Sequence, residues 1–282
     1  MTSVAQLPSH TNTMSRALVA ATVLSFAAVV PAVAQSTYAP PGDTLRYHET
    51  QKTAVVITTP QGEIQVSAEQ DATVALLRFA GDSAHAWFES LSLVAQSPQG
   101  EQKPPTDSVL RKPFRLTLDA RARAKLVEAP TFPEALRQFG DLANEFTDLL
   151  LRLPAKPLRI GLTWTDTLNR SDSTGDRKFN ATSISNYKVE KDTVVNGVPA
   201  LLVRASQATK LHAEGPVPNQ PGMRTDATME GNDTGFYVFA PKTGRMLARR
   251  RTGKFGGDVN IPAAGMTMKQ AIDYTNTVDA VQ

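Results

Sequence analysis

Residues 115–127 read RLTLDARARAKLV, in which charged or polar residues alternate with alanine or leucine along almost the whole stretch. Successive side chains of a strand point to opposite faces, so this period of two predicts an antiparallel sheet with one solvated face and one apolar face. Residues 63–69 (EIQVSAE) repeat the pattern. Long amphipathic strands are therefore the main element that we expect.

Short turns between apolar runs predict a meander of neighbouring strands. The strongest hairpin signal is Asn196-Gly197, because a type I′ turn needs a positive φ at both central residues. Glycine- and proline-rich loops are expected at about 97–108, 213–224 and 256–265. Strands are expected at 53–59, 73–80, 84–95, 115–127, 183–195, 198–209, 236–239, 245–252 and 267–279.

One segment departs from the period of two. Thr131-Phe132-Pro133-Glu134 matches a capping box with proline in the first turn. Apolar residues then recur at spacings of three and four up to Pro154: Phe139, Leu142, Phe146, Leu149 and Leu153. We therefore predict a mainly β (α+β) fold, in which a curved antiparallel meander or half-barrel sheet carries one long amphipathic helix, at about 132–153, on its concave face.

The N-terminus has the features of an export signal. Residues 17–30 (ALVAATVLSFAAVV) form an uncharged apolar run after Arg16, too short to span a bilayer comfortably. The small-x-small pattern Ala32-Val33-Ala34 follows, as signal peptidase requires. We expect residues 1–34 to be a cleaved signal peptide, with Met14 as an alternative start, and residues 35–282 to form a single exported domain.

The chain of 282 residues contains no cysteine. This excludes thiol catalysis, thiolate zinc sites, iron–sulfur clusters and a lipid-modified N-terminal cysteine. Exported eukaryotic domains more often carry disulfides, so we expect a bacterial protein that is periplasmic or secreted and does not span the membrane after cleavage. The 30 basic and 27 acidic residues give a formal net charge of +3, which is too small and too evenly mixed to predict a nucleic-acid partner.

No motif predicts a catalytic residue, a metal site or a cofactor. We find no nucleophile elbow, zinc-protease helix, Walker loop or dinucleotide fingerprint. His48-Glu49 makes a poor chelate, because adjacent residues of a strand point to opposite faces. The carboxylates leave a glycosidase pair open, but the two tryptophans are few for a carbohydrate cleft; the candidates are Glu89, Asp119, Glu190 and Asp226.

The densest positive charge is Arg249-Arg250-Arg251, with Arg245 and Lys254 nearby. On a strand, Arg249 and Arg251 face one way and Arg250 the other. Two interpretations stay open. The charges protect an edge strand against aggregation, or they form a basic surface patch that contacts an anionic envelope surface such as lipid headgroups or polysaccharide.

Two short sequence motifs support a resemblance to a known class of proteins. Residues 161–166 (GLTWTD) read as a strand-opening G-x-x-W-x-D, and residues 235–247 as a G-x-x-x-F-(D)-x-x-x-G-x-L hairpin, with Ala240 where Asp is common. Together with the signal, the meander and the helix, they resemble uncharacterised exported bacterial domains that are similar to periplasmic lipoprotein-carrier half-barrel proteins. The resemblance implies an open curved sheet and covering helices around a hydrophobic cavity for acyl chains, and it carries over no catalytic residue.

We therefore expect a non-enzymatic, exported cell-envelope protein that binds a lipid, an acylated protein or another hydrophobic ligand between sheet and helix. The candidate lining residues are aromatic: Phe79, Phe88, Phe139, Phe146, Trp164 and Phe236. Two alternatives stay open. One is a structural or interaction domain that docks a protein or polymer partner; the other is an envelope hydrolase with His85 or His212 beside a serine and a carboxylate. An unfilled concave face favours the ligand-binding hypothesis, and a filled face favours the interaction domain.

Overall fold

Long strands with alternating polar and apolar residues make up most of the computed structural model, which describes residues 37–38, 42–137, 142, 145–174, 177–217 and 222–281. Contacts separate the chain into two units, Met1–Val33 and Ala34–Gln282, and every described residue belongs to the second. The predicted signal peptide therefore lies outside the described residues.

The strands fall into two groups that follow one another in the sequence. The first group comprises β1 (Thr44–Thr59), β2 (Gly62–Arg78), β3 (Ser83–Ser97), β4 (Gly100–Gln102), β5 (Phe114–Leu118) and β6 (Ala124–Glu128). The second group comprises β7 (Thr163–Thr174), β8 (Arg177–Val195), β9 (Val198–Pro216), β10 (Arg224–Ala240), β11 (Arg245–Ile261) and β12 (Met266–Val281).

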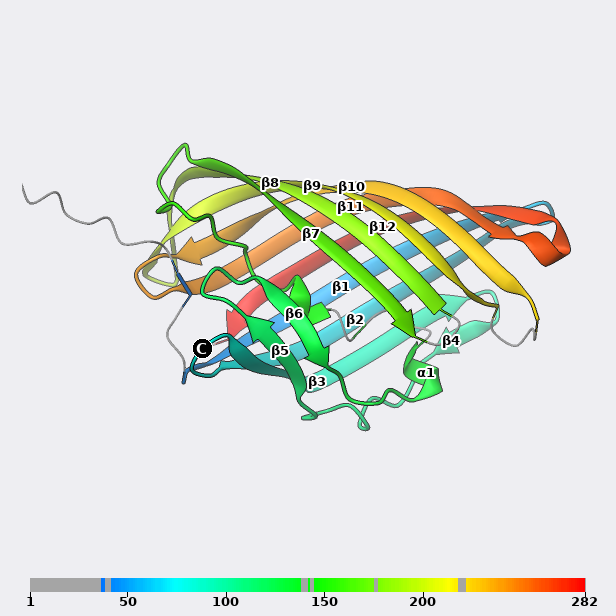
Figure 1. Ribbon diagram of the computed structural model, residues 1–282, viewed down its shortest axis with the longest axis horizontal. Coiled ribbons are helices and arrows are strands. Elements are labelled where there is room, and N and C mark those ends of the chain that lie inside the picture. Colours follow the sequence, from blue (N-terminus) through cyan, green and yellow to red (C-terminus); the bar gives the residue numbers. More distant parts are fainter. Residues whose placement is uncertain are drawn as a thin grey trace, which may run out of the picture. The chain divides into compact units, whose positions relative to one another are not determined.

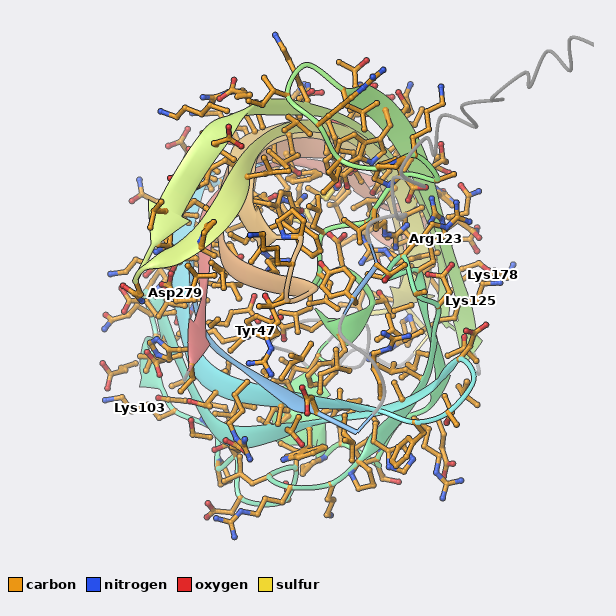
Figure 2. The ribbon with its side chains drawn as sticks, turned by 90° about the vertical axis from the view of Figure 1, so that its left-hand side faces the viewer. Tyr47, Lys103, Arg123, Lys125, Lys178 and Asp279 are labelled. Carbon is orange, nitrogen blue, oxygen red and sulfur yellow. The ribbon has the colours of Figure 1, made fainter. Side chains whose placement is uncertain are left out.

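All strands belong to one open antiparallel sheet, as predicted. Its order is β6-β5-β3-β2-β1-β12-β11-β10-β9-β8-β7, with β4 paired to β3 off this path. The first and last strands of the chain, β1 and β12, therefore pair in the middle of the sheet, while β6 and β7 form its edges (Figure 1). Figure 2 shows the strands curving around an interior that side chains such as Tyr47 occupy, with Lys103 and Lys178 at the periphery.

Turn residues account for one confirmed prediction, the hairpin at Asn196-Gly197, and for one difference from the predicted strands. Asn196 and Gly197 have φ values of 50° and 78° between the paired residues Val195 and Val198, which confirms the predicted hairpin. Residues 115–127, by contrast, form two strands, β5 and β6. The Asp119 carboxylate accepts hydrogen bonds from the backbone N–H groups of Arg121 (2.8 Å) and Arg123 (2.9 Å), which stabilises a turn between them.

The long helix predicted at 132–153 is wrong. Among the described residues, this region contains only the short helix α1 (Glu134–Arg137) and the single 3₁₀ turn η1 (Glu145–Thr147); a second 3₁₀ turn, η2 (Pro262–Ala264), lies elsewhere in the chain. Residues 149–154 are irregular and buried at every position. The helix was expected because apolar residues recur on one face, whereas this segment is buried on all sides. Residues 145–154 lie inside the curved sheet, and we call them the plug.

Beyond η1, the backbone groups of the plug do not form the hydrogen bonds of a helix. Several of them bond instead to side chains and backbone groups elsewhere in the chain. Tyr38 Oη donates to the Leu151 carbonyl (3.0 Å), and Trp164 Nε1 donates to the Arg152 carbonyl (3.0 Å). The Leu153 N–H donates to the Arg121 carbonyl near the β6 edge (3.0 Å). These bonds satisfy buried polar groups of the backbone without regular secondary structure.

The plug fills one end of the concave face. Phe146 packs on Phe88 and Phe114, with ring centroids 5.0 and 4.8 Å away, and Leu149, Leu151 and Leu153 are at most 1% exposed. Toward the other end of the same strands, inward-facing side chains are less covered, and Ile64 is 37% exposed. The concave face is therefore packed at one end and partly open at the other.

Candidate functional site

A cavity of about 390 Å³ lies on the concave face where the plug stops covering the sheet. The residues that line it come from β1, β2 and β7–β12, together with Leu142 and the plug residues Glu145 and Asp148. The volume lies in the range of about 300–1,000 Å³ that is typical of small-molecule sites.

Part of the cavity wall is apolar, and several of its apolar side chains are only partly buried. They are supplied by alternate residues of the long strands: Phe179, Leu211, Met229, Phe255 and Ile272. Each of these residues lies on the inward side of its strand, because the period of two that predicted the sheet also places these side chains on one face.

Glycines in β10 and β11 make room for two aromatic rings beside the cavity. A Cβ atom at Gly231 would lie 2.3 Å from Cδ1 of Phe255, and one at Gly253 would lie 2.4 Å from Cε1 of Tyr274. The two rings stack with centroids 5.8 Å apart. Phe255 and Tyr274 therefore lie close to the backbone of the sheet and leave the space above them free.

One side of the cavity is charged. Arg249 Nη2 donates to Glu49 Oε1 (2.9 Å) and to Asn276 Oδ1 (2.8 Å), while Asn276 Nδ2 donates to Glu49 Oε1 (2.7 Å). The Glu49 side chain is 1% exposed. Arg249 also donates to the carbonyls of Asp148 and Leu149, so the same guanidinium joins β1, β12 and the plug.

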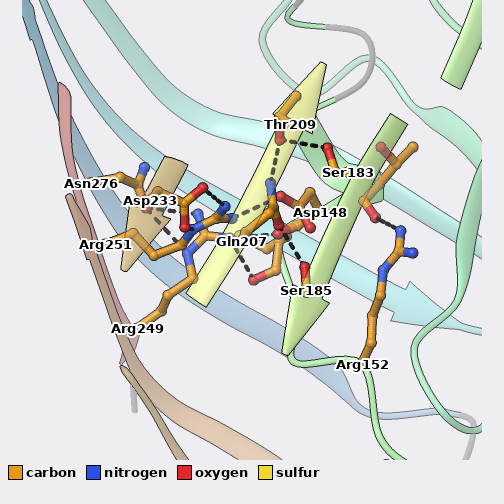
Figure 3. A network of polar contacts seen from close by, with 12 residues as sticks. Asp148, Arg152, Ser183, Ser185, Gln207, Thr209, Asp233, Arg249, Arg251 and Asn276 are labelled. Atoms are coloured by element: carbon orange, nitrogen blue, oxygen red, sulfur yellow. Dashed lines mark hydrogen bonds and ion pairs between the residues drawn. The ribbon is translucent and has the colours of Figure 1, made fainter. Parts of the chain in front are cut away.

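Arg251 forms the second half of this charged network (Figure 3). It donates to both carboxylate oxygens of Asp233 (3.1 and 2.6 Å) and to Asp148 of the plug (2.8 Å). Burial alone would raise the pKa of Asp148, but the nearby positive charges, of which that of Arg251 has the largest effect, lower it overall. The Asp148 carboxylate is therefore a charged partner of Arg251 at neutral pH.

Uncharged polar side chains continue the network onto β8 and β9. Ser183 and Thr209 share a hydrogen bond (2.8 Å), and Ser185 donates to Gln207 (2.8 Å), whose amide donates to Thr209 (3.2 Å). Figure 3 shows these side chains across the interior from Arg249 and Arg251. The cavity is therefore amphipathic, because apolar side chains and largely hydrogen-bonded polar side chains both line it.

The aromatic residues singled out from the sequence lie elsewhere. Phe88 and Phe146 belong to the packed end, and Trp164 stacks on Tyr187 with centroids 4.9 Å apart. Phe236 contributes to a separate apolar cluster beside Val238 on the outer face of β10, and Phe79, 38% exposed, packs on His85. None of these residues lines the cavity described above, and Phe139 lies outside the described residues.

The predicted basic patch is divided between the two faces of the sheet. β11 lies between β10 and β12, so it is not an edge strand, and Arg249 and Arg251 are 5% and 8% exposed. These two arginines therefore belong to the interior, because buried carboxylates meet them there. The remaining members pair with acidic residues nearer the surface: Arg245 with Asp43, Arg250 with Asp279 and Lys254 with Asp273.

The histidines lie away from the cavity. His48 contacts Asp71 (3.1 Å), and His212, on the outer face of β9, contacts Glu214 (3.2 Å) and Asp226 (3.5 Å). Neither they nor His85 is among the described residues that line the cavity, where the hydrolase alternative expects a histidine. Within the described ranges, no group of three or more His, Asp or Glu side chains is arranged to hold a metal ion.

Sequence comparison gives no relative for this chain: no family model matches it, and no curated protein matches it. Among solved structures, the chain is similar to lipovitellin, from a study of lipid–protein interactions, with 10% identity over 86% of this chain and a TM-score of 0.43. It spans about a quarter of that protein, since the match covers 25% of the lipovitellin chain.

Two further structures are more distant. Neisserial surface protein A matches with 8% identity, 84% of this chain, 99% of that chain and a TM-score of 0.25. A DUF1329 family protein from Desulfovibrio piger matches with 10% identity, 80% of this chain, 83% of that chain and a TM-score of 0.17. Likenesses this remote carry no argument about function. The functional interpretation of this chain therefore depends on the cavity.

No helix in the described part of the chain is long and apolar enough to cross a membrane.

Proposed function

We propose that this protein is a non-enzymatic, exported cell-envelope protein that binds a lipid or another hydrophobic small molecule in the cavity on the concave face. The observation that carries the proposal is the unfilled space on the concave face, part of whose wall is apolar. A concave face packed along its whole length would have favoured an interaction domain; the plug covers one end of it only.

Burial of an alkyl chain supplies the binding free energy in this proposal. Each methylene group that leaves water contributes about 0.8 kcal/mol. The partly exposed side chains of Leu211, Phe255 and Ile272 would lose contact with water at the same time. The hydrogen-bonded plug and the long paired strands hold the walls in place before the ligand arrives, which reduces the entropy cost of binding.

The location is part of the proposal and is supported by the N-terminal sequence. Arg16, the apolar run at 17–30 and Ala32-Val33-Ala34 support export and cleavage of residues 1–34. The absence of cysteine supports a bacterial periplasmic or secreted protein. A soluble binder of lipids or acylated proteins in that compartment needs such a cavity to shield the hydrocarbon from water.

The first test asks whether the protein contains a ligand. The chain is purified from the exported fraction without detergent and examined by native mass spectrometry and by lipid extraction, and a fluorescent fatty acid is then titrated into the delipidated protein. We expect a co-purifying hydrophobic molecule and saturable binding of the probe. If neither is found, the proposal is refuted.

A pair of variants locates the binding. Leu211→Trp places a large ring in the cavity, whereas Ile184→Trp adds the same ring to the outer face of β8, where Ile184 is 44% exposed. Displacing about two buried methylene groups weakens binding roughly tenfold, so we expect this loss for Leu211→Trp. We expect no loss for Ile184→Trp, and equal losses in both variants would contradict binding in the cavity.

A further inference from the structure

We propose that the ligand is an anionic amphiphile, whose carboxylate or phosphate head binds Arg170 while its alkyl tail crosses the apolar wall of the cavity. This inference depends on the proposed function and specifies the chemical class of its ligand.

Arg170 is an unusual member of the cavity lining. It lies on β7, directly opposite Ala181 of β8, and faces inward with the other residues of the site. Its Nε atom is buried and has no hydrogen-bond partner, and no ion pair joins its side chain to a residue in the described part of the chain. A buried donor without a partner is energetically costly, so Arg170 has unused binding capacity.

Four other arginines have carboxylate partners, although the Nε atom of Arg152 is likewise buried without a hydrogen-bond partner. Arg249 is bonded to Glu49, Arg251 to Asp233 and Asp148, and Arg123 and Arg152 to Asp166. Each of these guanidinium groups is therefore compensated by a carboxylate of this chain. Arg170 is the cavity-lining arginine, among the residues described, that lacks such a carboxylate.

The chemistry of the guanidinium defines the missing partner. Its planar fork of N–H donors matches the oxygen pairs of carboxylates and phosphates, and the hydrogen bonds are strengthened by the opposite charges. A neutral head, such as the hydroxyl of an alcohol, offers no charge to compensate. The group that fits beside Arg170 is therefore an anionic oxygen head.

The carboxylates that line the cavity already have partners. Asp148 accepts from Arg251 (2.8 Å) and Glu49 from Arg249 (2.9 Å). Glu145 Oε1 accepts from Gln70 Nε2 (2.7 Å). Among the described residues that line the cavity, Arg170 is therefore the cation without a carboxylate partner.

The register of the sheet sets a path for the tail. Arg170 pairs with Ala181, Ala181 with Leu211, and Leu211 with Met229, so one row of directly opposed residues runs from β7 to β10. Strands lie about 4.8 Å apart, which makes this row roughly 14 Å long. An amphiphile with its head at the β7 edge would therefore place its tail on side chains that carry no charge.

The test compares two probes with the same tail. Dodecanoate and dodecanol are titrated by calorimetry into the delipidated, signal-free chain at pH 8, where the acid is ionised. Arg170→Gln removes the charge inside the cavity, and Arg204→Gln removes a charge on the outer face of β9, where Arg204 pairs with Glu190. Binding of dodecanol also reports whether each variant is folded.

We expect the wild type to bind dodecanoate at least tenfold more tightly than dodecanol. Arg170→Gln should weaken dodecanoate binding by roughly tenfold to a hundredfold, the effect of a charge-assisted hydrogen bond, and leave dodecanol binding unchanged. Arg204→Gln should match the wild type, and acetate should not displace dodecanoate.

Three results would overturn the inference. Equal affinities for the two probes, or an unchanged preference in Arg170→Gln, would refute the anionic head while leaving hydrophobic binding intact. Displacement by acetate alone would indicate a site for small anions instead of an amphiphile. Failure of both probes to bind would refute the proposed function as well.

Discussion

Removing Arg251 should destabilise the protein far more than removing its neighbour Arg250. In Arg251→Met, the carboxylate of Asp233, whose side chain is 2% exposed, loses both of its hydrogen bonds to the guanidinium, and Asp148 loses its bond at 2.8 Å. Breaking a buried ion pair from one side costs about 3–5 kcal/mol, because the remaining charge stays buried without a partner.

Arg250→Met is the matched control on the adjacent position of the same strand. Arg250 pairs with Asp279 on the other face of the sheet, with side-chain exposures of 37% and 50%. Exposed ion pairs contribute about 0–1 kcal/mol, so we expect a loss of about 1 kcal/mol for this variant. Urea unfolding at pH 7, followed by circular dichroism, measures both changes.

The pH dependence gives a second readout with a definite sign. In the wild type the pKa of Asp148 is lowered, so its contribution to stability is complete above its ordinary value of 3.8 and is lost as the pH falls through the folded-state pKa. In Arg251→Met, burial remains but the largest of the charges that lower the pKa of Asp148 is absent, so protonation of Asp148 at acid pH relieves part of the penalty. The stability difference between wild type and variant should therefore shrink between pH 7 and pH 4. A loss no greater than that of Arg250→Met, or a difference that does not change with pH, would refute this account of the network.

Three further substitutions test the packing and the turns by the same unfolding measurement. Leu151→Ala in the plug should cost about 2–5 kcal/mol, because the side chain is fully buried; a loss below 1 kcal/mol would mean that the plug is loosely packed. Gly253→Ala should cost about 1–3 kcal/mol, since its Cβ would lie 2.4 Å from the Tyr274 ring, and the near-ultraviolet dichroism of the aromatic residues should change with it. Gly197→Ala should cost about 1–2 kcal/mol, because residue 197 has a φ of 78°; an unchanged midpoint would contradict that turn conformation.

The sheet could be predicted from the sequence because polar and apolar residues alternate within single strands, which is a local pattern. Alternation in 63–69 and the Asn196-Gly197 turn are local signals, and the structure places both as expected. The ends of the strands were less predictable. β8 and β9 begin or end several residues beyond the predicted ranges, since polar residues such as His212 are tolerated on the outer face of a strand.

The plug could not be predicted, because spacing alone does not show what surrounds a segment. The spacing of Phe146, Leu149 and Leu153 is that of a helix, yet Leu150 and Leu151 between them are equally buried. An uninterrupted apolar run signals burial on all sides. The structure replaces the helical bonds with donors from distant parts of the chain, such as Tyr38, and no local pattern identifies such donors.

The ligand-binding hypothesis expects an unfilled part of the concave face, but the sequence does not identify the residues that line the cavity. Aromatic residues were expected to line it, whereas Phe88 and Phe146 fill the packed end and Phe236 faces outward. The charged end was missed because each arginine and carboxylate looks like a surface residue when taken alone. One signal was present: Glu49 lies two residues after Tyr47, on the apolar face of its strand, where a charge needs a buried partner.

The most direct test of the central claim is a crystal structure of the delipidated protein with 12-bromododecanoate, measured at the bromine absorption edge. Binding inside the curved sheet predicts an anomalous peak among Leu211, Met229 and Phe255, with the carboxylate of the ligand beside Arg170. A structure at saturating ligand that shows no bromine in the cavity, or bromine only against the outer face near Phe236, would contradict the account.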